Sequence, residues 1–110
     1  MPKQIEVKTI EKYSYMCFSS RSGDEDTKAV IMLSEGDNFI GYLHFMSNGC
    51  VLPKAEKKYG LYYYYYHHAE LAPLVDMLRN EQPIYLIYVE DDKHNCRIST
   101  VMEPVGEGEQ

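Results

Sequence analysis

The sequence predicts an α+β domain in which a mainly antiparallel sheet of about five to six strands packs against a single α-helix, inserted before the last two strands. Short apolar runs are separated by two-residue turn signals, and one stretch alone has its apolar residues at helical spacing. The length of 110 residues suits one domain. A content of 45% hydrophobic and 25% charged residues is typical of globular proteins.

The first apolar pattern lies within residues 3–20. Ile5, Val7 and Thr9 alternate with Lys and Glu, and the alternation shifts phase near Glu11 before it continues. Alternation with a period of two predicts a strand. The phase shift leaves open whether this segment forms one bent strand or two short ones.

A hairpin is expected between the apolar runs 29–33 and 38–46, which Gly36-Asp37 separates. A Gly in the first position of a two-residue loop favours a type II′ turn. With that loop, the strands pair Leu33 with Ile40, Ile31 with Tyr42 and Ala29 with His44.

Asn48-Gly49 predicts a second hairpin, because both residues tolerate a positive φ. Its register sets Met46 opposite Val51 and Phe45 opposite Leu52. Pro53 should end the returning strand, since it has no N–H for the ladder. An exposed connection at 54–58 then leads to the tyrosines.

The helix is expected where Leu71, Leu74, Val75 and Leu78 recur at helical spacing. Pro73 is tolerated only in a first turn, so the helix must begin close to it. Leu74 and Leu78 should dock the helix on the sheet.

Two strands should follow the helix, which Pro83 ends. The run 84–90 has no polar face and is therefore expected in a central position. After a polar turn, 96–102 should return as the last strand.

We expect one domain over residues 1–103 and a disordered acidic tail over 104–110, which is rich in Gly and Glu. A formal net charge of −6 argues against a surface that attracts polyanions. The apolar runs are far shorter than the ~20 residues of a membrane span. The three cysteines are widely spaced, which predicts reduced thiols in a cytoplasmic protein.

The stretch YGLYYYYYHHAEL contains five consecutive tyrosines. In a strand, Tyr63 and Tyr65 point to one face and Tyr62, Tyr64 and Tyr66 to the other. Tyrosine favours strands, and its ring and hydroxyl suit a half-covered sheet or an interface. The run therefore predicts a structural or interface role.

Binding of single-stranded nucleic acid is the alternative for this run, because aromatic residues on a sheet can stack on bases beside positive groups. Lys54, Lys57 and Lys58 precede the tyrosines and would contact phosphates. The negative net charge opposes this interpretation.

The histidines do not predict a metal site. His67 and His68 are adjacent, so on a strand they point to opposite faces. His94 precedes Cys96 by two residues but falls in a predicted turn. Structural zinc sites have four Cys or His ligands at short paired spacings, a pattern that this chain lacks.

The sequence also lacks the common nucleotide-binding and hydrolase motifs. His44 and Cys50 could form a nucleophilic pair. The predicted register, however, sets His44 opposite Pro53 and turns the two side chains to opposite faces. We therefore expect no catalytic residues, no cofactor and no enzyme.

The expected function is that of a non-enzymatic binding or accessory module that forms a homodimer. The predicted hairpin is apolar on both faces, with Ile31 and Tyr42 on one and Val30 and Leu43 on the other. One helix covers one face, so a curled sheet, a protein partner or a second copy must cover the other. A dimer should bury at least ~800 Å² per subunit, including some of residues 62–66.

A third interpretation is a small-molecule pocket between sheet and helix, lined by tyrosines and His44.

Overall fold

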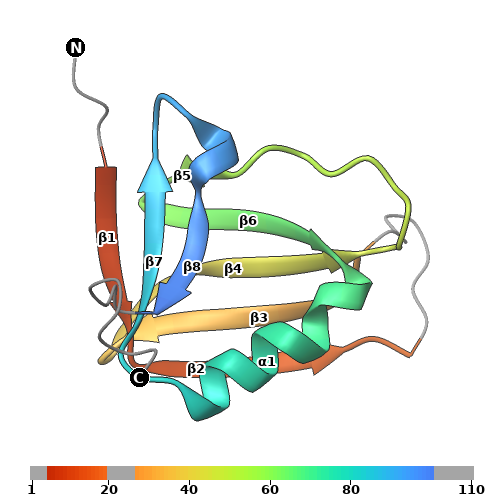
Figure 1. Cartoon of the computed structure of the whole chain (residues 1–110), viewed down its shortest axis with the longest axis horizontal. Coiled ribbons are helices and arrows are strands. Elements are labelled where there is room, and N and C mark those ends of the chain that lie inside the picture. The colour runs from red at the N-terminus through yellow and green to blue at the C-terminus, as the bar shows by residue number, and fades with distance from the viewer. Residues whose placement is uncertain (1–4, 20–26, 101–110) are drawn as a thin grey trace, which may run out of the picture.

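The computed structural model describes residues 5–19 and 27–100. Its described elements alternate strands with one α-helix and two short 3₁₀ helices (Figure 1). In chain order they are β1 (Ile5–Ile10), β2 (Lys12–Cys17), β3 (Thr27–Glu35), β4 (Asn38–Met46), β5 (Glu56–Lys58), β6 (Leu61–His67), η1 (His68–Glu70), α1 (Leu71–Asn80), β7 (Ile84–Val89), η2 (Lys93–Asn95) and β8 (Arg97–Thr100).

The strands form two sheets, one of five strands in the order β2-β3-β4-β6-β5 and one of three strands in the order β1-β7-β8. In Figure 1 the three-stranded sheet and α1 lie on the same side of the five-stranded sheet, whose strands run across those of the smaller sheet. The two layers enclose one core. Its largest fully buried side chains are Tyr62, Tyr64, Tyr88, Phe45, Ile31, Leu33, Leu43 and Leu86. The predicted α+β class, with one helix before the last two strands, is confirmed.

The N-terminal apolar segment forms two strands, and each belongs to a different sheet. β1 pairs antiparallel with β7, and β2 pairs antiparallel with β3. Glu11 separates them, and its backbone N–H donates to the carbonyl of Ser34 at 2.9 Å. The phase shift in the sequence therefore marks the point where the chain passes from one sheet to the other.

The β3–β4 hairpin forms with the predicted loop, but its predicted register is wrong. Gly36 has a φ of 61°, as a type II′ turn requires. A register shift next to Leu33 leaves Ile40 without a direct partner, so Leu33 pairs with Gly41. Beyond this bulge, Ile31 pairs with Leu43, and Ala29 pairs with Phe45.

The observed register places side chains of different chemistry on the two faces of the hairpin. The core face of the hairpin is therefore formed by Ile31 and Leu43, and the opposite face carries Met32 and Tyr42. The expected mixture of Ile31 with Tyr42 does not occur.

The predicted hairpin at Asn48-Gly49 is also wrong. Gly49 has a φ of 89°, and the N–H of Cys50 donates to the carbonyl of Ser47 at 3.2 Å, as in a type II turn. Instead of returning beside β4, the chain continues through an irregular segment to β5. The neighbour of β4 is β6, which pairs with it in parallel.

Residues 56–58 form the short edge strand β5 rather than only an exposed connection. β5 pairs antiparallel with the first residues of β6 through the two-residue loop Tyr59-Gly60. Tyr59 and Gly60 have φ angles of 54° and 79°, which is the type I′ geometry. Tyrosine is unusual in this left-handed conformation, so the residue at position 59 did not indicate the turn.

The helix and the strand after it lie as predicted. Leu74 and Leu78 are buried, and Pro73 lies in the first turn of α1. β7 occupies the centre of the three-stranded sheet. Among the described residues, α1 is far too short to cross a membrane, and no other helix is longer. The expected tail at 104–110 lies outside the described residues.

Replacing Leu78 with Ala should lower the free energy of unfolding by about 2–5 kcal/mol, because the change leaves a cavity between α1 and the sheet. Urea unfolding measures this loss. The exposed Arg79→Ala serves as the matched control on the same helix and should change stability by less than about 0.5 kcal/mol. A loss below about 1 kcal/mol for Leu78→Ala would show that the helix is not docked through this residue.

Replacing Tyr59 with Asn should raise the free energy of unfolding by about 0.5–1 kcal/mol, because Asn tolerates the left-handed conformation better. The β-branched control Tyr59→Val should lower it, although both variants remove the same exposed ring. Equal effects of the two substitutions would contradict a backbone origin.

Candidate functional site

The five tyrosines of β6 divide between the two faces of the five-stranded sheet. Tyr62 and Tyr64 are buried, and Tyr66 packs against the core beside them. Tyr63 and Tyr65 point to the opposite face, which we call the outer face. The predicted alternation is confirmed, and the parallel register with β4 determines which tyrosines are inside.

The inward tyrosines have partners for their hydroxyl groups. Tyr62 donates to Oε1 of Glu6, and Tyr64 donates to the carbonyl of Ile87. Burial raises the pKa of both phenols, so they stay protonated donors at neutral pH. These contacts join β6 to β1 and β7 of the other sheet.

Glu6 is the charged residue in this junction. Lys57 Nζ lies 2.7 Å from Oε1 of Glu6, the oxygen that also accepts from Tyr62. The hydrogen bond from Lys57, followed by that from Tyr62, holds the pKa of Glu6 below its usual value of 4.5. Lys57 is therefore engaged on the inner side of the sheet.

The outer face carries a ladder of stacked rings across β4 and β6. Tyr42 and Tyr63 have ring centres 5.4 Å apart and planes inclined by 26°. His44 and Tyr65 lie 5.3 Å apart with planes inclined by 20°. Phe39 adds an edge-on contact to Tyr42 at 4.9 Å.

The geometry of these stacked pairs determines which parts of the rings a ligand could contact. Nearly parallel rings with centres at this separation are stacked with a lateral offset. The rings of the ladder therefore turn part of their faces toward one another. A flat platform for incoming bases would need the opposite arrangement.

The outer face continues beyond the ladder onto β2 and β3. Met16 pairs across with Val30, which pairs with His44, and Met32 pairs with Tyr42. No described element packs over these residues on this side (Figure 1). We define the outer face by eight side chains: Met16, Val30, Met32, Phe39, Tyr42, His44, Tyr63 and Tyr65.

The three predicted lysines do not form one cluster. Lys57 pairs with Glu6 on the inner side, whereas the ammonium of Lys58 lies 5.3 Å from the ring centre of Tyr63 on the outer face. Lys58 also pairs with Glu56 at 3.6 Å. Lys54 is exposed in the segment before β5 and lines a separate cavity.

The remaining histidines and cysteines provide no described metal cluster. Within residues 5–19 and 27–100, no group of three or more His, Cys, Asp or Glu residues is arranged to hold an ion. The hairpin that set His44 opposite Pro53 does not form. Cys50 lies in the loop after β4, where its carbonyl is 2.7 Å from Nε2 of His67.

Sequence reasoning identified the tyrosines and His44 but missed Met16, Met32, Phe39 and Tyr42 as one surface. Their common face depends on the bulge beside Leu33, for which the sequence carries no local signal. Comparison with family models, with curated protein sequences and with solved structures gave no match to this chain.

Replacing Glu6 with Gln should lower stability at neutral pH, and this deficit should shrink in acid. A carboxylate whose native pKa is lowered stabilises the fold above its usual pKa and loses this effect as the pH falls through the native pKa. The free energies of unfolding of both proteins should therefore converge as the pH drops from about 5 to about 3.

The exposed Glu81→Gln is the control, and its difference from the unmodified protein should stay small throughout. A Glu6→Gln deficit that is independent of pH would show that Glu6 acts through packing rather than through its charge.

Proposed function

We propose that this protein is a non-enzymatic binding module that forms a homodimer through the outer face of its five-stranded sheet. The observation that carries the proposal is the composition of this face. Its centre is apolar and aromatic, with Met32, Tyr42, Tyr63 and Tyr65 only half-buried in the single chain. Tyr and Met are enriched at the centres of protein interfaces, and charged residues are depleted there.

The charges at the margin of the face support a second copy as the partner. The chain has a formal net charge of −6, so two copies repel each other on average. At the margin of the outer face, two ion pairs between opposite charges reduce this repulsion locally. Lys58 pairs with Glu56 at 3.6 Å, and Lys12 pairs with Asp37 at 3.2 Å.

The area of the outer face is also close to that of a dimer interface. β3 and β4 have nine residues each, which gives a length of ~30 Å at ~3.3 Å per residue. The strands β2, β3, β4 and β6, spaced by ~4.8 Å, give a width of ~20 Å. The flat area of ~600 Å², before the relief of the side chains is added, approaches the ~800 Å² per subunit of a standard interface.

The arrangement of rings and lysines weighs against the nucleic-acid alternative. The ladder rings turn part of their faces to one another, and Lys58 is paired with Glu56 beside Tyr63. Lys57 and Lys54 lie away from the outer face. A single strand would therefore find few open ring faces and few phosphate contacts along the ladder.

A second apolar surface provides the competing dimer interface. On the outward side of the three-stranded sheet, Ile5 and Val7 are 58% and 55% exposed. Val7 pairs with Ile87, and Tyr85 lies two residues before Ile87 on the same face of β7. This surface is narrower, because β1 and β7 alone supply its apolar residues. Tyr85 on this surface therefore serves as the matched control residue in the dimer experiment.

Light scattering at micromolar concentration should give a mass of twice the 12.8 kDa of one chain. Tyr42→Glu should reduce the mass to that of one chain, because it places a charge at the centre of the outer face. Tyr85→Glu, the same substitution on the other sheet, should leave the dimer intact. The exposed Met16→Glu repeats the test at the margin of the face if Tyr42→Glu does not fold.

A mass of one chain at every concentration would contradict the dimer, and loss of the dimer in Tyr85→Glu alone would move it to the other sheet. Micromolar binding of single-stranded oligonucleotides that weakens steeply with salt, and that Tyr42→Glu abolishes, would favour the nucleic-acid alternative instead.

A further inference from the structure

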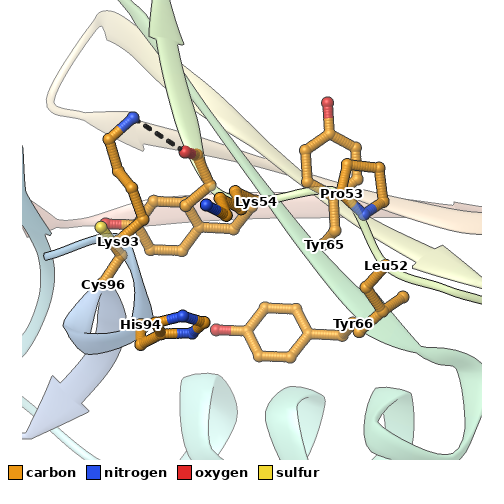
Figure 2. Close-up of a pocket in the computed structure, with 10 residues that line it drawn as sticks. Leu52, Pro53, Lys54, Tyr65, Tyr66, Lys93, His94 and Cys96 are labelled. Carbon is orange, nitrogen blue, oxygen red and sulfur yellow. Dashed lines mark hydrogen bonds between the residues drawn. The ribbon is translucent and has the colours of Figure 1, made fainter.

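A cavity of about 270 Å³ opens at the edge of β6 (Figure 2). On the edge of β6 away from β4, β5 pairs only with residues 61–63, so on that edge no described strand lies beside Tyr64–Tyr66. The segment 52–55 passes over this uncovered edge, and the η2 turn closes the other side. This site differs from the expected pocket, since α1 and His44 do not line it.

The walls of the cavity are held together by contacts across it. Lys93 Nζ donates to the carbonyl of Ala55 at 3.2 Å, which ties η2 to the segment before β5 (Figure 2). Cys96 Sγ accepts from the N–H of Val89 at 3.3 Å, which fixes the end of the turn to β7. These contacts hold the walls of the cavity in place, and the thiol of Cys96 is engaged with the backbone.

The polar groups at the cavity are basic or donating. Lys54, Lys93 and His94 line it, and none of the described residues that line it is Asp or Glu. Lys93 is partly balanced by Glu90 at 3.9 Å. Among the described residues, no carboxylate lies within ion-pair distance of Lys54.

Tyr66 supplies a neutral donor at the same place. Its ring stacks on Phe45 with centres 5.6 Å apart, and Figure 2 shows its hydroxyl pointing toward His94. Burial raises the pKa of Tyr66 to about 12, so the hydroxyl keeps its proton at neutral pH. A ligand at this end of the cavity would meet hydrogen-bond donors from two different elements.

We propose that this cavity binds a small organic anion, with its carboxylate or phosphate group at Lys54, His94 and Tyr66 and its apolar body against Leu52 and Pro53. Basic and donating groups around a cavity in an acidic protein favour an anion over a neutral ligand or a cation. The volume lies below the ~300–1,000 Å³ of drug-sized sites, so the ligand has few non-hydrogen atoms.

Benzoate, phenyl phosphate and the neutral benzamide are suitable probes, because all three carry the same ring and benzamide lacks the charge. Titration of the full chain, followed by amide chemical shifts, should show shifts at Leu52, Lys54, Ala55 and residues 93–96 with benzoate or phenyl phosphate. Benzamide should cause none of comparable size. Whichever anion binds more tightly identifies the head group that the site prefers.

Lys54→Gln should weaken binding of the anion by at least about tenfold, because it removes a cation that has no carboxylate partner among the described residues and leaves the buried core unchanged. Lys12→Gln, an exposed lysine paired with Asp37, is the matched control and should bind as the unmodified protein does. The proposal is overturned if neither anion binds at concentrations up to about 10 mM. It is equally overturned if benzamide binds as well as benzoate or if Lys54→Gln binds unchanged.

Discussion

The parallel pairing of β4 with β6 is the constraint on which the rest of the structure depends. Gly41 lies beside Tyr62 in this register, and a Cβ at Gly41 would overlap the backbone carbonyl of Tyr62. Since side chains alternate along a strand, a slip by one residue would exchange the buried and the exposed tyrosines. This close approach of two backbones therefore determines both the core and the outer face.

The tyrosine run of β6 has two structural roles, because its two faces contact different parts of the molecule. Inside, the hydroxyls of Tyr62 and Tyr64 bond to the other sheet, which avoids the cost of burying a polar group without a partner. Outside, Tyr63 and Tyr65 stack on residues of β4 and are only half-buried. Because β5 is short, the later residues of β6 have an open edge, and the basic cavity forms there.

Features encoded by neighbouring residues could be predicted from the sequence, whereas those set by distant pairing could not. The spacing of Leu74 and Leu78 identified the helix, and the phase shift at Glu11 marked a break between strands. The prediction of a hairpin at Asn48-Gly49 failed because these turn residues permit several turn types. They form a turn in which Cys50 donates to Ser47, and residues 50–55 after it belong to no strand. For the candidate site, alternation separated the tyrosines correctly. The three lysines are separated because Lys57 and Lys58 alternate along β5 and Lys54 precedes it. The cavity needs η2, which is far away in the sequence.

Because β1 and β2 belong to different sheets, they can pair at different stages of synthesis. β1 has its only described sheet neighbour in β7, so residues 5–10 have no strand to join until residue 89 has left the ribosome. β2, directly after it, can already join β3 and β4. During synthesis the backbone of residues 5–10 therefore stays unpaired until β7 has emerged, and unpaired strand edges of this kind favour aggregation.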